Sequence, residues 1–154
     1  GIRMWPEFKG RDGCRTPFPW KKRGVSAGFS DAPKTWLPIP PEHRELAVDQ
    51  QTRNPDSMLN FYRNLLAWRK THPALLKGRL KLLPADPQLL GYERRLDDDA
   101  LLCVFNFSGK KARLPLPRGW AEGVIDEGSG LTGAEIRRSA LVLGPWSGAV
   151  LIRP

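Results

Sequence analysis

The sequence is poor in long apolar runs and in cysteine, and each shortage excludes a class of protein. No segment of the 154 residues is apolar over enough length to span a bilayer. The start lacks the basic-then-apolar order of a signal peptide. The two cysteines, Cys14 and Cys103, are too widely separated to resemble the disulfide framework of a secreted mini-protein. We therefore expect no membrane partner and a reducing, cytoplasmic location.

Acidic residues are also scarce. The 16 aspartates and glutamates face 25 lysines and arginines, which gives a formal net charge of +9. Such a balance can indicate a polyanionic partner. However, the basic stretches 1–25 and 53–81 do not interleave basic side chains with stacking aromatics, as a nucleic-acid surface does. We therefore expect no nucleic-acid partner.

Potential metal ligands are few. His43 has no second ligand at a useful spacing. The run Asp97–Asp99 lacks the alternating oxygen ligands and the distal glutamate of a calcium loop, and it is typical of a solvated hairpin turn. We expect no metal and no cofactor.

Glycine and proline, by contrast, are abundant, with 15 of each. Residues 1–52 show no sustained period and are expected to form one long irregular segment, which its aromatic residues should keep ordered over a large surface. Within it, the run from Gly10 to Trp20 contains Arg11 and Arg15, two glycines and two stiffening prolines. This pattern predicts a rigid cationic platform of the kind that binds polar ligands.

One helix is expected over residues 54–72. Asn54 followed by Pro55 is typical of a helix start, and Asp56 would lie in the first turn, where the helix dipole favours negative charge. A broad apolar face follows, and Pro73 ends the helix. A face this wide requires a substantial packing partner.

From residue 78 the pattern changes to short apolar runs separated by turn signals. They predict an antiparallel sandwich of about seven strands with Greek-key connections. Phe105 and Phe107, two residues apart on an apolar strand, are expected in its core. The expected strands are 79–83, 88–96, 100–107, 112–116, 123–126, 140–143 and 149–153.

Several of these runs together resemble one family. The segments Gly10–Trp20, Ser26–Ser30, Val48–Gln51 and Asn60–Arg63 are similar to segments of the α-glucosidase and oligo-1,6-glucosidase group in the α-amylase family of glycoside hydrolases. Phe18 and Lys21 stand where methionine and aspartate are common in that group. The resemblance is strong over residues 1–78 and weaker beyond.

The resemblance implies an α+β fragment: the last loop and last helix of a (β/α)8 barrel, followed by an all-β antiparallel sandwich. In this interpretation the end of the catalytic barrel occupies residues 1–77, with the loop after strand eight at 1–52 and the last barrel helix at 54–72. The C-terminal sandwich domain occupies 78–154.

The resemblance also implies that the parent protein is an α-glucosidase, expected to hydrolyse short α-linked glucosides with retention. Neither histidine is followed by aspartate, so the family's Asn-His-Asp motif is absent, and we expect the catalytic carboxylates to lie on a missing N-terminal part. The chain alone is expected to have no catalytic residue and no activity, and to meet its α-glucoside or oligosaccharide substrate only through the missing barrel.

In the family an arginine of the Gly10–Trp20 motif borders the pocket that holds the non-reducing glucose. The resemblance therefore implies that Arg11, and as a second choice Arg15, binds substrate, because a guanidinium fork suits a carboxylate and a diol together. The alternative is that both arginines only brace the loop through backbone carbonyls.

Two other hypotheses remain for the whole chain. It could be a stand-alone β-sandwich module that binds carbohydrate or protein, which would require a cluster of aromatics on one face of the sandwich. It could also be the tail of a related transglycosylase or sucrose-handling enzyme of the same family.

Overall fold

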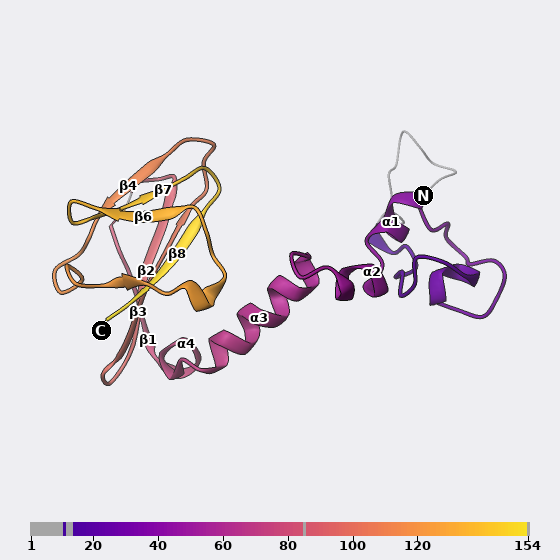
Figure 1. The fold of residues 1–154 in the computed structure, drawn as a ribbon, viewed down its shortest axis with the longest axis horizontal. Coiled ribbons are helices and arrows are strands. Elements are labelled where there is room, and N and C mark those ends of the chain that lie inside the picture. Colours follow the sequence, from indigo (N-terminus) through magenta and orange to yellow (C-terminus); the bar gives the residue numbers. More distant parts are fainter. Residues whose placement is uncertain (1–10, 12–13, 85, 154) are drawn as a thin grey trace. The chain divides into compact units, whose positions relative to one another are not determined.

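A computed structural model describes residues 11, 14–84 and 86–153. The chain divides into two compact units, Gly1–Tyr62 and Arg63–Pro154. The boundary falls within helix α3 (Met58–Lys70) (Figure 1). In the described ranges, no helix combines the length and the apolar character that a membrane crossing requires.

The first unit contains short helices, so the prediction of one irregular segment over residues 1–52 is wrong in part. A 3-10 helix η3 (Val25–Gly28) and two α-helices, α1 (Pro41–Glu45) and α2 (Val48–Arg53), interrupt it (Figure 1). Pro41 opens α1 at the position where its missing N–H costs no hydrogen bond. These helices are too short to produce a period in the sequence.

Helix α3 forms as expected, but it begins later and ends earlier than predicted. The Ser57 hydroxyl accepts from the Asn60 amide at 3.2 Å, and so Ser57 caps the helix start. Asn54 instead accepts from the Asp56 amide at 3.0 Å, in a turn before the helix. At the other end, Pro73 does not simply stop α3 but opens a further short helix, α4 (Pro73–Lys77).

The second unit is a two-sheet antiparallel sandwich, as predicted. One sheet has five strands in the order β1-β2-β3-β8-β5, and the other has three in the order β4-β7-β6. The connections β3–β4, β4–β5, β5–β6 and β7–β8 each pass from one sheet to the other. The strands are β1 (Arg79–Leu82), β2 (Leu89–Leu96), β3 (Asp99–Asn106), β4 (Ala112–Pro115), β5 (Val124–Ile125), β6 (Ala134–Arg137), β7 (Ala140–Leu143) and β8 (Gly148–Ile152).

Strand β6 is the one that the sequence prediction omits. It pairs with β7 through a two-residue turn, Arg138–Ser139, in which both residues have positive φ, 46° and 56°. Glycine and asparagine are the usual residues for this backbone conformation, and neither is present. The turn therefore carries no signal in the sequence, and the strand that precedes it is largely exposed.

The main core lies between the two sheets. Leu102, Val104 and Leu151 from the larger sheet pack with Leu141 and Leu143 from the smaller one. The outer face of the larger sheet is also covered, because α4 and the end of α3 pack on it through Ala74, Trp68 and Leu75. Strand β3 is thus buried on both faces, which explains why its sequence is almost continuously apolar.

One core prediction is wrong. Phe105 is partly buried in the second cluster, on the outer face of the sheet, but Phe107 is exposed. The Phe107 amide still donates to the Gln88 carbonyl at 2.8 Å, so pairing continues to this residue. Helix α4, however, covers this face at the opposite end of β3, where the Ala74 amide donates to Asp99 at 2.7 Å.

Candidate functional site

The loop that carries Arg11 and Arg15 is organised around one carbonyl. The Arg11 oxygen accepts from the Cys14 amide at 3.1 Å, from the Cys14 thiol at 3.0 Å and from Arg15 Nε at 3.4 Å. Both arginine side chains belong to exposed residues. The contact from Arg15 Nε to the Arg11 carbonyl is a backbone brace, which is the alternative role considered for these arginines. Arg15 also lies on the rim of a hollow.

That hollow has a volume of about 440 Å³ and is mostly apolar. Phe18 and Phe29 line it, and Phe18 meets Trp20 edge to face with ring centroids 5.2 Å apart. Trp36 is 98% exposed at its rim. The lining residues are Arg15, Thr16, Pro17, Phe18, Phe29, Ser30, Lys34, Thr35, Trp36 and Leu37. A guanidinium beside open aromatic faces can bind both the hydroxyls and the apolar face of a sugar ring.

Several contacts within the first unit hold this loop in shape. The amides of Trp20 and Lys21 both donate to the Ala27 carbonyl, at 3.0 and 2.9 Å. Ser26 and Ala27 are buried and have positive φ, and the Ser26 hydroxyl donates to the Ala32 carbonyl at 2.6 Å. Arg44 Nη1 donates to the Lys22 carbonyl at 3.2 Å. Arg44 thus braces the loop through a backbone carbonyl, a role that the sequence does not reveal.

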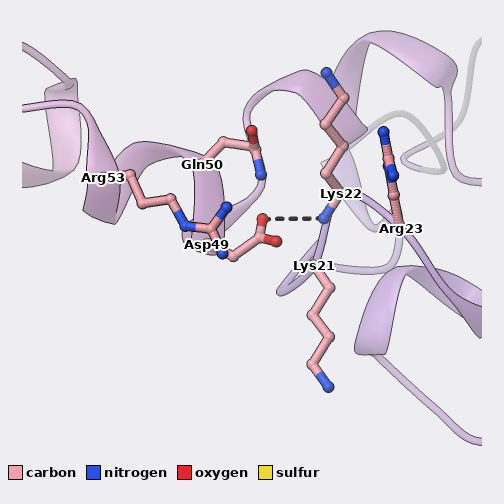
Figure 2. Close-up of a pocket in the computed structure, with 6 residues that line it drawn as sticks. All are labelled: Lys21, Lys22, Arg23, Asp49, Gln50 and Arg53. Carbon is pink, nitrogen blue, oxygen red and sulfur yellow. Dashed lines mark hydrogen bonds between the residues drawn. The ribbon is translucent and has the colours of Figure 1, made fainter.

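A second hollow, of about 490 Å³, lies between the loop and α2 (Figure 2). Asp49 sits at its centre and accepts from the Lys22 amide at 3.0 Å. Burial opposes ionisation of this carboxyl, but the Lys22 and Gln50 hydrogen bonds and the Arg53 charge hold its pKa below the ordinary value. Asp49 thus anchors α2 to the loop as a carboxylate.

The cations around this second hollow do not converge on one point. Lys21 and Lys22 extend in opposite directions (Figure 2). Lys22 Nζ pairs with Glu45 at 2.5 Å. The Trp20 carbonyl, directly before Lys21 in the chain, accepts from the Asp49 amide at 3.1 Å. This hollow is therefore a structural junction rather than a ligand site. Sequence reasoning missed Asp49, although it lies in the Val48–Gln51 run that carries part of the family resemblance.

His72 also has a role that the sequence does not reveal. Its Nε2 atom lies 3.3 Å from Asp126 Oδ2, and the same oxygen accepts from the Trp68 indole at 2.8 Å. The His72 ring also contacts the Trp68 ring, with centroids 4.8 Å apart and the ring planes tilted by 55°. These contacts fasten the end of α3 to the sandwich, within the second unit.

The described residues include no group of three or more histidine, cysteine, aspartate or glutamate side chains placed to hold a metal ion. The predictions that the chain has no metal, no cofactor and no catalytic residue of its own stay predictions.

Comparison with known proteins decides the family. The family model described as "Alpha amylase, catalytic domain" matches residues 2–78, half of the chain, and "Maltogenic Amylase, C-terminal domain" matches residues 80–150. The chain belongs to the α-amylase family. The matches to a catalytic domain and then to a C-terminal domain agree with the predicted fold class, which is the end of a barrel followed by an all-β domain. The predicted boundary at residues 77 and 78 stays a prediction.

Individual α-amylase family members support this assignment. A probable α-glucosidase of Rhizobium meliloti is 41% identical over 146 residues, which cover 95% of this chain and 26% of that protein. The crystal structure of XgtA, an α-glucosyl transfer enzyme, matches with a TM-score of 0.85 at 36% identity, over 99% of this chain and 28% of XgtA. The trehalulose synthase MutB of Pseudomonas mesoacidophila MX-45 matches with a TM-score of 0.75 at 30% identity, over 93% and 26%.

The chain thus spans about a quarter of the length of these α-amylase family members. Arg11 and Arg15 fall in the part that the catalytic-domain model matches, and the sandwich falls in the other part.

Proposed function

We propose that this chain forms the last loop, last helix and sandwich of an α-glucosidase, and that Arg11 and Arg15 help to bind its α-linked glucoside. The observation that carries the proposal is the position of Arg15 on the rim of an aromatic hollow, inside the segment matched by the catalytic-domain model. Arg15 Nε donates to the Arg11 carbonyl at 3.4 Å. A guanidinium carries five N–H donors in a fixed fork, which suits hydrogen bonds to sugar hydroxyls.

The chemistry of the parent enzyme follows from its class. Hydrolysis with retention requires two carboxyl groups about 5 Å apart, one acting as nucleophile and the other as acid and base. In our proposal these groups come from outside this chain. The loop contributes by orienting the sugar: the guanidinium donates to hydroxyls, and the aromatic side chains contact the ring face. The 154-residue chain alone should therefore not cleave a chromogenic α-glucoside.

A chimera tests the proposal. This chain would replace the matching segment of the probable α-glucosidase of Rhizobium meliloti, which is 41% identical to it. If the chimera cleaves the chromogenic substrate, Arg11→Ala and Arg15→Ala should lower its kcat/KM by roughly ten- to a hundredfold, the cost of a lost charged hydrogen bond. The control is Arg23→Ala, an exposed arginine of the same unit, which should change kcat/KM less than about twofold.

Two results would contradict the proposal. An active chimera that tolerates both Arg11→Ala and Arg15→Ala would show that these side chains only brace the loop. Cleavage of the substrate by the 154-residue chain alone would show that the catalytic groups lie within it.

A second candidate is glucosyl transfer rather than hydrolysis. It is supported by the structural match to XgtA, described as an α-glucosyl transfer enzyme, and to a trehalulose synthase. Product analysis of the active chimera with sucrose or maltose separates the two, because hydrolysis releases only the constituent sugars and transfer yields new disaccharides or longer products.

We also propose a cytoplasmic location for the parent, since Cys14 and Cys103 are both free thiols. Non-reducing electrophoresis of the protein purified from its source would contradict this location if it showed an inter-chain disulfide through Cys14. The absence of a nucleic-acid partner remains a prediction from the sequence.

A further inference from the structure

A third hollow lies within the second unit, between the helices and the outer face of the larger sheet. Its volume is about 240 Å³. Drug-sized ligands usually occupy about 300–1,000 Å³, so this hollow suits a compact molecule of roughly ten non-hydrogen atoms. Most of its lining is apolar: Leu65, Trp68, Leu75, Phe105, Leu131 and Val150.

Aromatic side chains approach the hollow from both the sheet and the helix. Tyr92 and Phe105, on the neighbouring strands β2 and β3, stack with ring centroids 6.2 Å apart, and both are only partly buried. Trp68 comes from α3, where its indole donates to Asp126 Oδ2 at 2.8 Å and is thereby held in place. Rings arranged in this way can pack edge to face or offset against a further ring. The lining therefore favours an aromatic ligand.

Arg94 brings a positive charge to this apolar hollow. Its Nη2 atom donates to the Gly78 carbonyl at 2.9 Å, whereas its Nε atom is buried and has no hydrogen-bond partner among the described residues. Such an unpaired buried donor is costly to a fold. The other cation of the lining is Arg69, and the described lining residues include no aspartate or glutamate. A carboxylate is the ligand group that fits a guanidinium fork best.

Two other ionisable groups line the hollow, and neither supplies a negative charge at neutral pH. Burial raises the pKa of the Tyr92 hydroxyl to about 12 and that of the Cys103 thiol to about 11. Both groups are therefore protonated at neutral pH, so they do not neutralise Arg94. The charge of Arg94 remains available to an anionic ligand.

We propose that this hollow binds a small aromatic carboxylate, whose ring packs beside Trp68 and Phe105 and whose carboxylate accepts from the Arg94 guanidinium. A ligand held in this way contacts α3 and the sheet together and therefore stabilises the second unit. A protein partner would need about 800 Å² of contact, which a hollow of this size does not offer. The site goes beyond the proposed function, because it uses neither Arg11 nor Arg15.

The test is a titration of the isotope-labelled 154-residue chain with phenylacetate, followed by two-dimensional NMR. The amides of Cys103 and Phe105 should show the largest shift changes, with a Kd on the order of 0.1–1 mM for a ligand of this size. Phenylacetamide has the same shape without the charge, and acetate has the charge without the ring. At constant ionic strength, each should bind at least about tenfold more weakly than phenylacetate.

A matched pair of variants tests the role of Arg94. Arg94→Met keeps most of the length of the side chain but removes the charge, and it should weaken phenylacetate binding at least about tenfold. The control is Arg95→Met at the next residue of β2, which points to the other face of the sheet and pairs with Glu93 at 2.9 Å. It should change the Kd less than about twofold. If Arg94→Met does not fold, the comparison of phenylacetate with phenylacetamide still decides, because it needs no variant.

Stability gives a second measure of binding. At ten times its Kd, phenylacetate should raise the Tm of the second unit by about 3–6 °C, and Arg94→Met should remove this rise. Equal binding of phenylacetate and phenylacetamide would overturn the proposal. Shift changes confined to the first unit would also overturn it, because they would place the ligand elsewhere.

The chimera described above tests whether the hollow stays open in a complete enzyme. Phenylacetate should protect the active chimera against heat, and Arg94→Met should abolish this protection without changing kcat/KM. Binding to the 154-residue chain that is lost in the active chimera would overturn the proposal, because the rest of the enzyme would then fill the hollow. Failure of the Arg11 and Arg15 tests leaves the NMR result unaffected, so the two proposals fail separately.

Discussion

The two units of the chain are stabilised in different ways. In residues 63–154, large side chains such as Leu101, Leu102 and Trp120 are fully buried. Among residues 11 and 14–62, which the structure describes in the first unit, the buried residues are small, such as Ser26 and Ala27, and most large apolar side chains are exposed. The exposed ones are Phe18, Trp20, Val25, Phe29, Trp36, Leu46, Met58 and Tyr62.

The first unit relies instead on hydrogen bonds to backbone groups, such as those from the amides of Trp20 and Lys21 and from the Arg44 guanidinium. Each such bond contributes only about 1 kcal/mol, whereas burying one large side chain contributes about 2 kcal/mol or more. The second unit can therefore supply its own stability, whereas the first unit needs an apolar cover. Under the proposed function, the rest of the barrel is that cover.

The largest difference between the units should appear when a buried and an exposed tryptophan are compared. Trp120→Ala should lower the free energy of unfolding by about 3–5 kcal/mol, because it leaves a cavity and deprives Glu93 of a hydrogen bond of 2.9 Å. Trp36→Ala, at a side chain 98% exposed, should change it by less than about 0.5 kcal/mol. Urea unfolding followed by circular dichroism measures both.

If Trp120→Ala fails to fold, Trp120→Phe preserves most of the volume and still tests the buried site. Equal effects of the Trp120 and Trp36 substitutions would break the contrast between the units.

A smaller effect is expected where α3 joins the sandwich. Asp126→Ala removes the acceptor of the Trp68 indole and of the Gly128 amide, at 2.8 Å each, and should cost about 2–3 kcal/mol of unfolding free energy. The control is Glu122→Ala at an exposed site of the same unit, with an expected change near zero. A neutral Asp126→Ala would mean that the helix end does not depend on this carboxylate.

Alkaline pH should weaken the sandwich selectively. Burial raises the pKa of Cys103 to about 11 and that of Tyr92 to about 12, so the folded state favours their neutral forms. The contribution of the neutral Cys103 thiol to the free energy of unfolding is fully present below pH 9, the ordinary pKa of the thiol. This contribution is lost as the pH rises through 11. This loss should be roughly 2 kcal/mol. Cys103→Ala should flatten the decline of unfolding free energy between pH 9 and 11, and an unchanged slope would contradict the assignment.

The smallest effect should come from a surface ion pair of the first unit. Lys22 and Glu45 are both exposed, and water and salt screen their attraction. A double-mutant cycle with Lys22→Ala and Glu45→Ala should give a coupling below about 1 kcal/mol that shrinks in high salt. A larger, salt-insensitive coupling would show that the first unit holds this pair out of solvent.

Much of the sandwich could be predicted from the sequence, because its strands combine apolar patterning with visible turn signals. The turn at Asp97 and Asp98 connects β2 to β3 as expected. Strand β6 could not be predicted, since its turn at Arg138–Ser139 adopts positive φ without glycine or asparagine. The start of α3 differs from the prediction because Asn54–Pro55 has the residue types of a helix cap, whereas Ser57 provides the cap.

The candidate site could be predicted only in part. Arg11 and Arg15 were found through a family resemblance, which supplied a role but no geometry. The anchor at Asp49 depends on a contact with Lys22, 27 residues earlier in the chain, and no local pattern reveals it.

Amide hydrogen exchange tests the contrast between the units most directly. Two hydrogen-bonded amides make a matched pair: Asp126, which donates to Val150 at 2.8 Å in the sandwich, and Trp20, which donates to Ala27 at 3.0 Å in the loop unit. Since both are bonded, their exchange rates report the stability of their surroundings. We predict exchange at least about a hundredfold slower at Asp126 than at Trp20. Equal protection at the two sites would contradict the account, because it would show that the loop unit is as stable by itself as the sandwich.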